Sequence, residues 1–309
     1  MQNSPAEDAH LAESGLFGPG APLSTEAVAA LRAHPRFAEA ARQVSQCLTS
    51  LYQGNRILNQ LVNDRGRVLL GFLLLQLHYA KREDDPQSGL TAGRVVDLCV
   101  EHGICSRGRA KALLMLMRVG GYLAPAPGGP DKRIRLLVPT ERLTALHYDR
   151  WRCQFRAIAL ILPEGERALQ ALDDPRFVPV FLDRLSGYFF SGHRVLGVSP
   201  ELGAYIDRNA GLLILLSLLL ASDAENPERP VPISISGLAN RYSVSRAHVL
   251  KFLRDAAGDG LIARPGPGDQ IALTPRFIEA LEKFLANMFL FNVHAAREAL
   301  AAMQKTVAA

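Results

Sequence analysis

The chain has 309 residues, of which 48% are apolar, 21% charged and 7% aromatic. This apolar fraction is typical of globular proteins and excludes wholesale disorder and a fibrous repeat, while the length predicts about two domains. The formal net charge of +5 permits a nucleic-acid partner but is too small to identify one.

The N-terminal residues 1–24 are rich in Gly, Pro, Ser and acids, which predicts a disordered tail. The first residues are acidic where a secretory signal would be basic, so we expect no signal peptide. Two apolar runs follow, Val68–Leu77 and Ala210–Ala221, and the longer has 12 residues. Because about 18 are needed to cross a bilayer, both runs are predicted to be buried core helices, with no membrane partner.

The first half of the chain is predicted to form three helices, a β-hairpin and a fourth helix, from its apolar periodicity and turn signals. The second and third helices are separated only by the short turn Gly103–Cys105, and the hairpin tip spans 128–133. The predicted elements are Arg67–Lys81, Thr91–His102, Ser106–Val119, Tyr122–Val138 and a helix capped by Thr140.

The second half shows the same order more clearly. An apolar helix, Gly211–Ser222, precedes a short helix and the tight turn Ser243-Val244. Ser245 is a good N-cap for the next helix, because its hydroxyl can accept from a free backbone N–H. That helix should bury Val249, Phe252, Leu253 and Ala256, which recur at helical spacing. A hairpin follows, with strands Leu261–Ala263 and Gln270–Leu273, and then a helix capped by Thr274 with Pro275 at its first position.

The two halves also repeat each other in sequence. Residues 105–107 (Cys-Ser-Arg) match 244–246 (Val-Ser-Arg), and 121–124 match 260–263, both at an offset of 139. Six such matches occur in one order, at offsets between 135 and 143. A period this long indicates a duplicated domain rather than a solenoid. We expect a tail at 1–24 and two copies of one module, at 25–162 and 163–309.

In this order of elements, each copy resembles the winged helix-turn-helix domain of bacterial transcriptional regulators, most nearly the MarR-like group. The resemblance implies a mainly α fold with small β-hairpin wings, and two tandem modules forming a pseudo-twofold intramolecular dimer. It leaves open whether the chain is a monomeric pseudo-dimer or a homodimer. It further implies a small aromatic effector bound near Tyr188–Phe190 and Tyr79 or Tyr148.

A recognition helix needs outward residues near its N-terminus that reach bases and phosphates. Segments 106–118 and 241–254 each hold four cations and no acid, and the serines at the helix starts favour phosphate binding there. The first wing tip is the more basic, so we expect the two modules to contribute unequally to DNA recognition. The candidate DNA-binding residues are Ser106, Arg107, Arg109, Lys111, Arg118, Lys132, Arg133, Arg135, Ser245, Arg246, His248, Lys251, Arg254 and Arg264.

Other chemistry has little support in the sequence. The eight histidines form no metal-binding motif, and there is no phosphate-binding or nucleophile motif, so we expect no metal, no cofactor and no enzyme activity. The cysteines (Cys47, Cys99, Cys105 and Cys153) lack CxxC spacing, which favours a reducing cytoplasm. Cys99 and Cys105 stand where the second copy has Leu238 and Val244, so core packing is favoured over thiol sensing.

The sequence therefore predicts a cytoplasmic, nucleoid-associated regulator that reads an imperfect palindrome in double-stranded DNA. Two alternatives stay open. Some plasmid replication initiators also contain two winged helices, and iteron-like direct repeats in the selected DNA would favour that class. Winged helices also serve as protein-interaction modules, which a tight protein partner and salt-insensitive behaviour would favour.

Overall fold

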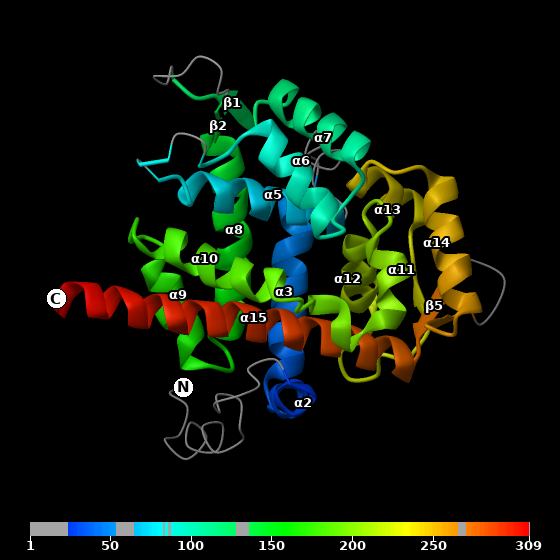
Figure 1. The fold of residues 1–309 in the computed structure, drawn as a ribbon. Helices are drawn as coiled ribbons and strands as arrows, with labels where there is room; N and C mark the ends of the chain where they lie inside the picture. Colours follow the sequence, from blue (N-terminus) through cyan, green and yellow to red (C-terminus); the bar gives the residue numbers. More distant parts are fainter. Residues whose placement is uncertain are drawn as a thin grey trace.

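A computed structural model describes residues 24–53, 65–82, 84–85, 88–127, 136–264 and 270–308. Over these ranges the chain is mainly helical, with small antiparallel sheets (Figure 1). This confirms the mainly helical class predicted from the sequence. Of the predicted tail, residues 1–23 lie outside the described ranges. Ser24 is the N-cap of α2, where its Oγ accepts from the Ala27 N–H at 3.1 Å.

The first half contains the predicted helices and hairpin at nearly the predicted positions, preceded by two helices that were not predicted. Its elements are α2 (Thr25–Arg32), α3 (Phe37–Leu51), α5 (Arg65–Tyr79), α6 (Ala92–Glu101), α7 (Arg107–Val119), β1 (Leu123–Pro125), β2 (Leu137–Pro139) and α8 (Glu141–Ile158). Strands β1 and β2 pair antiparallel, with Leu123 opposite Pro139, and a bridge joins Leu136 to Thr91.

The second half opens with helices that hold its later elements against the first half. These are α9 (Pro163–Ala171), α10 (Phe177–Phe190), the 3-10 turns η1 (Val195–Val198) and η2 (Pro200–Leu202), α11 (Gly203–Ile206) and α12 (Gly211–Ala221). The chain continues through β3 (Val231–Pro232), α13 (Ile235–Tyr242), α14 (Arg246–Gly258), β4 (Ile262–Ala263), β5 (Gln270–Leu273) and α15 (Pro275–Ala308). The strand order in this sheet is β3-β5-β4.

Equivalent hydrogen bonds occur within each half, in addition to the sequence matches between the halves. Thr140 Oγ1 donates to the Gly121 carbonyl at 2.7 Å, and Thr274 Oγ1 donates to the Gly260 carbonyl at 2.8 Å. Both glycines have positive φ, +72° and +70°, a conformation that a residue with Cβ adopts only with strain. Thr274 Oγ1 also accepts from the Phe277 N–H at 3.2 Å, as a cap should. Thr140 stands at the cap position of α8 but makes no side-chain cap bond.

The turn between α6 and α7 in the first half is one residue longer than the turn between α13 and α14 in the second. The Ile104 N–H donates to the Cys99 carbonyl at 2.8 Å, and the Val244 N–H donates to the Ala239 carbonyl at 3.1 Å. Cys99 therefore corresponds to Ala239 and not to Leu238, because the first turn has one more residue before its serine cap. Cys99 is fully buried, as predicted for a core residue. Burial, together with the neighbouring Cys105, raises the pKa of its thiol to about 12.

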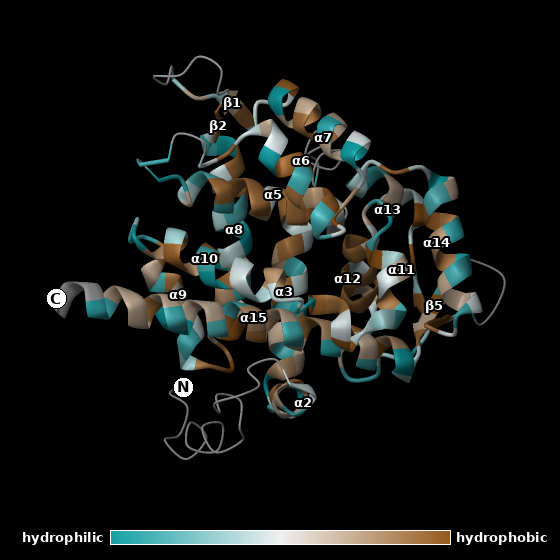
Figure 2. Ribbon diagram, in the orientation of Figure 1, coloured by the Kyte–Doolittle hydropathy of each residue, from teal (hydrophilic) through white to brown (hydrophobic). Residues whose placement is uncertain are grey.

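One continuous apolar core runs through both halves. The apolar helix α12 lies inside the molecule (Figure 2), as predicted for Ala210–Ala221. Helix α15, with 34 residues, runs along one side and packs against α2, α8, α9 and α10 (Figure 1). The sequence predicted the start of this helix at Thr274 and Pro275 but not its length, and neither proline nor glycine follows Pro275 within it.

A disulfide between Cys47 and Cys153 joins α3 to α8. Their Cα atoms are 5.6 Å apart although the residues are 106 positions apart in sequence. The cysteine spacing gave no sign of this pair, because it forms only where α3 and α8 pack together.

Among the described residues, no helix by itself has the length and apolar character needed to span a membrane. The segments Pro200–Ile206 and Gly211–Ala221 meet these criteria only when taken together, and they are bent by 111°.

Candidate nucleic-acid interface

Helices α7 and α14 begin and pack in the same way. The Oγ of Ser106 accepts from the Arg109 N–H at 3.4 Å, and the Oγ of Ser245 accepts from the His248 N–H at 3.1 Å, so each serine caps its helix as predicted. Each helix buries the face that its apolar periodicity predicted, and the opposite face is in solvent. The buried residues are Ala110, Leu113, Leu114 and Met117 in α7, and Val249, Phe252, Leu253 and Ala256 in α14.

Most of the candidate cations lie on the solvent side of these helices. His248 is half-buried, and the others are exposed. The exposed cations are Arg107, Arg109, Lys111 and Arg118 on α7, Arg246, Lys251 and Arg254 on α14, and Arg264 just after β4. Lys132, Arg133 and Arg135, and the hairpin tip at 265–269, lie outside the described residues.

Among the described residues, ion pairs with acids are seen for Arg107 and Lys251, so the basic faces are not wholly unopposed. Arg107 Nη2 lies 2.9 Å from Asp97 Oδ1, an acid carried by α6. Lys251 Nζ lies 3.0 Å from Asp255 Oδ2, one turn further along α14. Neither acid lies in the acid-free segments 106–118 and 241–254. Asp255 follows the second segment directly, and Asp97 comes close to Arg107 only through the fold.

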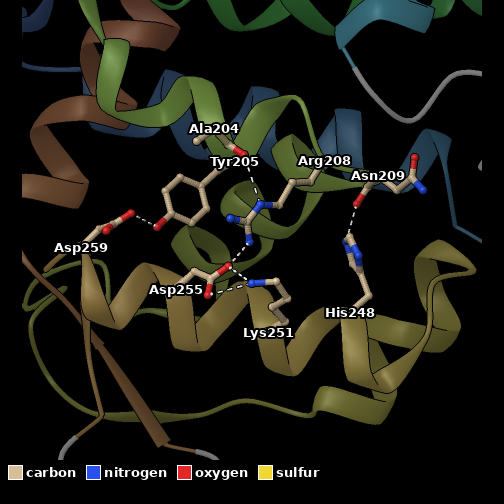
Figure 3. Close-up of polar contacts among 8 residues, drawn as sticks. All are labelled: Ala204, Tyr205, Arg208, Asn209, His248, Lys251, Asp255 and Asp259. Atoms are coloured by element: carbon tan, nitrogen blue, oxygen red, sulfur yellow. Dashed lines mark hydrogen bonds and ion pairs between the residues drawn. The ribbon is translucent and has the colours of Figure 1, made fainter.

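A polar network holds one side of α14 against α11 and the turn after it (Figure 3). Arg208 Nη1 donates to Asp255 Oδ2 at 2.7 Å, and its guanidinium lies over the Tyr205 ring, 5.0 Å from the centroid. The Tyr205 hydroxyl donates to Asp259. His248 Nε2 donates to the Asn209 carbonyl at 2.9 Å, so this candidate is directed into the network and not toward solvent. The network fixes the orientation of α14 relative to α11 and the turn that follows it.

The outermost strips of the two helices differ in chemistry. Residues one and two turns apart share a helix face, so we define the α14 strip as Ala247, Lys251, Arg254 and Gly258, and the α7 strip as Gly108, Ala112, Met115 and Val119. All eight residues are exposed. At the repeat offset of 139 residues, Ala112 and Met115 stand where α14 has Lys251 and Arg254. The α14 strip is therefore cationic, and the α7 strip is apolar.

Comparisons of the chain with protein-family models, with curated proteins and with solved structures find no match. The resemblance to MarR-like regulators therefore rests on the sequence pattern alone. Within the described ranges, no three His, Cys, Asp or Glu side chains are grouped so that they could hold a metal ion.

A cavity of about 330 Å³ lies between the two halves. Its walls come from α3, α5, α8, α10, α12 and α15, and the turn between α6 and α7 reaches it through Ile104. The lining is mostly apolar and includes Phe189 and Phe190. Tyr79, Tyr148 and Tyr188 are not among the described lining residues, and the Tyr188 hydroxyl instead donates to Glu298 at 2.6 Å.

Arg150 places a positive charge at this apolar cavity. Its side chain is only 7% exposed, its Nη1 donates to the Tyr52 hydroxyl, and its Nε has no hydrogen-bond partner. Among the described residues no carboxylate pairs with it. Burying an unpaired cation is costly, so the cavity is suited to an anionic group near Arg150.

Proposed function

We propose that the chain is a sequence-specific, double-stranded DNA-binding transcriptional regulator built from two winged helix-turn-helix modules. In this proposal α7 and α14 are the recognition helices, and the hairpins β1–β2 and β4–β5 are the wings. The two modules form a pseudo-twofold intramolecular dimer. It reads an imperfect palindrome whose half-sites lie about one helical turn apart.

The observation that carries the proposal is the outer face of α14. Arg246, Lys251 and Arg254 are exposed on a helix that follows a tight turn and is capped by Ser245. Among the described residues, Arg246 and Arg254 pair with no acid, so their guanidinium groups are available to phosphates and to guanine edges. The network around Arg208 supports this role, because it holds α14 in one orientation.

The two modules contribute unequally in this proposal. Ala112 and Met115 replace two cations on the outer strip of α7, and Arg107 is paired with Asp97 at 2.9 Å. We therefore assign most of the base reading among the described residues to α14, and phosphate contacts to Arg109, Lys111 and the N-terminus of α7. The two half-sites should differ in sequence.

Selection from random DNA duplexes, followed by binding measurements at several salt concentrations, tests the proposal. We expect an enriched imperfect inverted repeat and a loss of affinity of about tenfold or more for Arg246→Ala and for Arg254→Ala. A lost phosphate contact also lowers the salt slope by about 0.9. Arg107→Ala should cost less, because this arginine is partly neutralised by Asp97.

Arg36→Ala, between α2 and α3, is the matched control and should leave affinity unchanged. No enriched motif, together with unchanged binding by both α14 variants, would contradict the proposal. Enriched direct repeats would favour the replication-initiator class instead.

We further propose that the central cavity binds an effector with a carboxylate and an apolar body, which includes small aromatic acids. The guanidinium of Arg150, which no carboxylate among the described residues contacts, would receive the carboxylate, and the apolar walls would hold the body. The volume of about 330 Å³ lies at the lower end of the range of small-molecule pockets, about 300–1,000 Å³. Since Ile104 in the turn before α7 lines the cavity, a bound effector would contact that turn and could shift the position of α7.

Thermal-shift titrations with decanoate and 2-naphthoate, against decanol and 2-naphthol, test the effector site. We expect the acids to raise Tm more than the matched alcohols, and Arg150→Met to remove that difference. Arg150→Lys keeps the charge and should retain part of it. Equal effects of acids and alcohols would contradict the assignment.

A further inference from the structure

The outer face of α7 is exposed and apolar, whereas the solvent face of a surface helix is usually polar. Among the described residues, the large apolar side chains that are exposed are Val100, Met115, Leu116 and Val119, and all four lie on α6 or α7. Met115 is 69% exposed and Val119 78% exposed. Figure 2 shows hydrophobic segments along α7 at the edge of the molecule. Clustered exposure of this kind marks interaction surfaces.

The spacing of these residues matches the requirements of a helical partner. Ala112, Met115, Leu116 and Val119 follow the pattern i, i+3, i+4, i+7 and lie opposite the buried face of α7. A stripe of this form is what one amphipathic helix presents to another. The corresponding stripe on α14 contains Lys251, Arg254 and Asp255 and lacks this apolar character.

Charge decides what kind of helix fits. Lys111 and Arg118 lie along one edge of the stripe and Arg109 near its other edge, and α7 carries no acid. A second copy of α7 would bring like charges together, which disfavours self-association. DNA phosphates would satisfy the cations but leave the apolar centre without a partner. A helix with an apolar stripe and flanking carboxylates satisfies both features.

We propose that the outer face of α7, defined by Ala112, Met115, Leu116 and Val119 with the flanking Lys111 and Arg118, is a docking site for an acidic amphipathic helix of another protein. The apolar side chains of the partner pack on the stripe, and its carboxylates pair with the flanking cations. This inference goes beyond the proposed DNA binding, which rests mainly on α14. Because the docked helix would cover Lys111 and the outer face of α7, the partner helix and DNA would occupy that face in turn.

The experiment uses the full chain and a display library of helical peptides. The library fixes apolar residues at i, i+3, i+4 and i+7 and randomises the flanking positions. We expect selected peptides to be enriched in Asp and Glu at the flanks. Their affinity should fall at least tenfold for the double variant Met115→Ser/Val119→Ser, whose changes lie in solvent and should leave folding intact.

Charge reversal and a matched variant sharpen the test. Lys111→Glu/Arg118→Glu should weaken binding of the acidic peptides and select basic ones, whereas Arg254→Ser on α14 should leave peptide affinity unchanged. The proposal is overturned if acids are not enriched, or if binding is indifferent to the Met115/Val119 change. It is also overturned if sedimentation shows a dimer that this change dissociates, because a second copy would then cover the stripe.

Discussion

Arg208 and Asp255 form an ion pair, with Nη1 and Oδ2 separated by 2.7 Å, that links the turn after α11 to α14. The same carboxylate accepts from Lys251 at 3.0 Å. Both cations hold the pKa of Asp255 below its ordinary value, Lys251 contributing most. One acid thus positions α14 and also neutralises part of the charge that the helix would offer to DNA under the proposed function.

Replacing this acid should therefore separate stability from DNA affinity. In Asp255→Asn, Lys251 loses its paired anion and becomes available to a phosphate, so we expect tighter non-specific DNA binding with a steeper salt dependence. The Tm should fall, because Arg208 loses its ion pair. Asp259→Ala removes the carboxylate that accepts from the Tyr205 hydroxyl and should lower Tm without raising DNA affinity. Tighter binding by both variants would show that the gain is not specific to Lys251.

Gly260 should contribute to stability because of its backbone conformation and not because a side chain there would clash. Its φ is +70°, and a Cβ there would meet nothing within 4 Å. Gly260→Ala should lower the free energy of unfolding by about 1 kcal/mol, because an alanine is strained in the left-handed region. Gly258→Ala is the matched control, since its site is equally open and its φ is not positive. Urea denaturation should show this control to be neutral or slightly stabilising, and equal losses would contradict the explanation.

The Cys47–Cys153 disulfide should stabilise the chain measurably. It closes a long loop, with a sequence separation of 106, and such links typically contribute about 2–4 kcal/mol by restricting the unfolded state. A reducing agent should lower the urea midpoint of the wild type. It should not affect Cys47→Ala/Cys153→Ala. A wild-type midpoint that does not respond to reduction would show that the two thiols are unpaired in solution.

His147 should make stability depend on pH below neutrality. It is fully buried, and neither ring nitrogen has a hydrogen-bond partner among the described residues. Burial, together with the nearby Arg150, lowers its pKa to about 3. The unfolded chain, where the pKa is about 6.5, binds the proton first. The unfolding free energy therefore falls as the pH drops from about 6.5 toward 3, by up to about 1.4 kcal/mol per pH unit.

His147→Phe retains an aromatic ring but cannot titrate, so its stability should depend less on pH over this interval. Denaturant titrations at several pH values measure the difference between the two proteins. Because His78 and the carboxylates titrate equally in both, parallel curves would contradict the assignment to His147.

Short-range signals accounted for the elements that carry the candidate site. Ser106 and Ser245 act as N-caps because a hydroxyl at that position reaches a backbone N–H three residues on. The buried faces of α7 and α14 follow from apolar residues at helical spacing. The hairpin strands at β1, β2, β4 and β5 follow from short apolar runs between turn residues. Each of these depends on neighbours within a few positions, which a sequence displays directly.

The sequence by itself therefore determined the helical class, the repeated order of elements and the serine caps. Only the tertiary structure decided that Arg107 meets Asp97, that Cys47 meets Cys153, and that Arg150 lies buried at a cavity between the halves. These relationships join residues on different helices, and their distances depend on how whole helices pack. The mild net charge suggested a basic surface, but packing determined which cations meet acids, as Arg107 and Lys251 do.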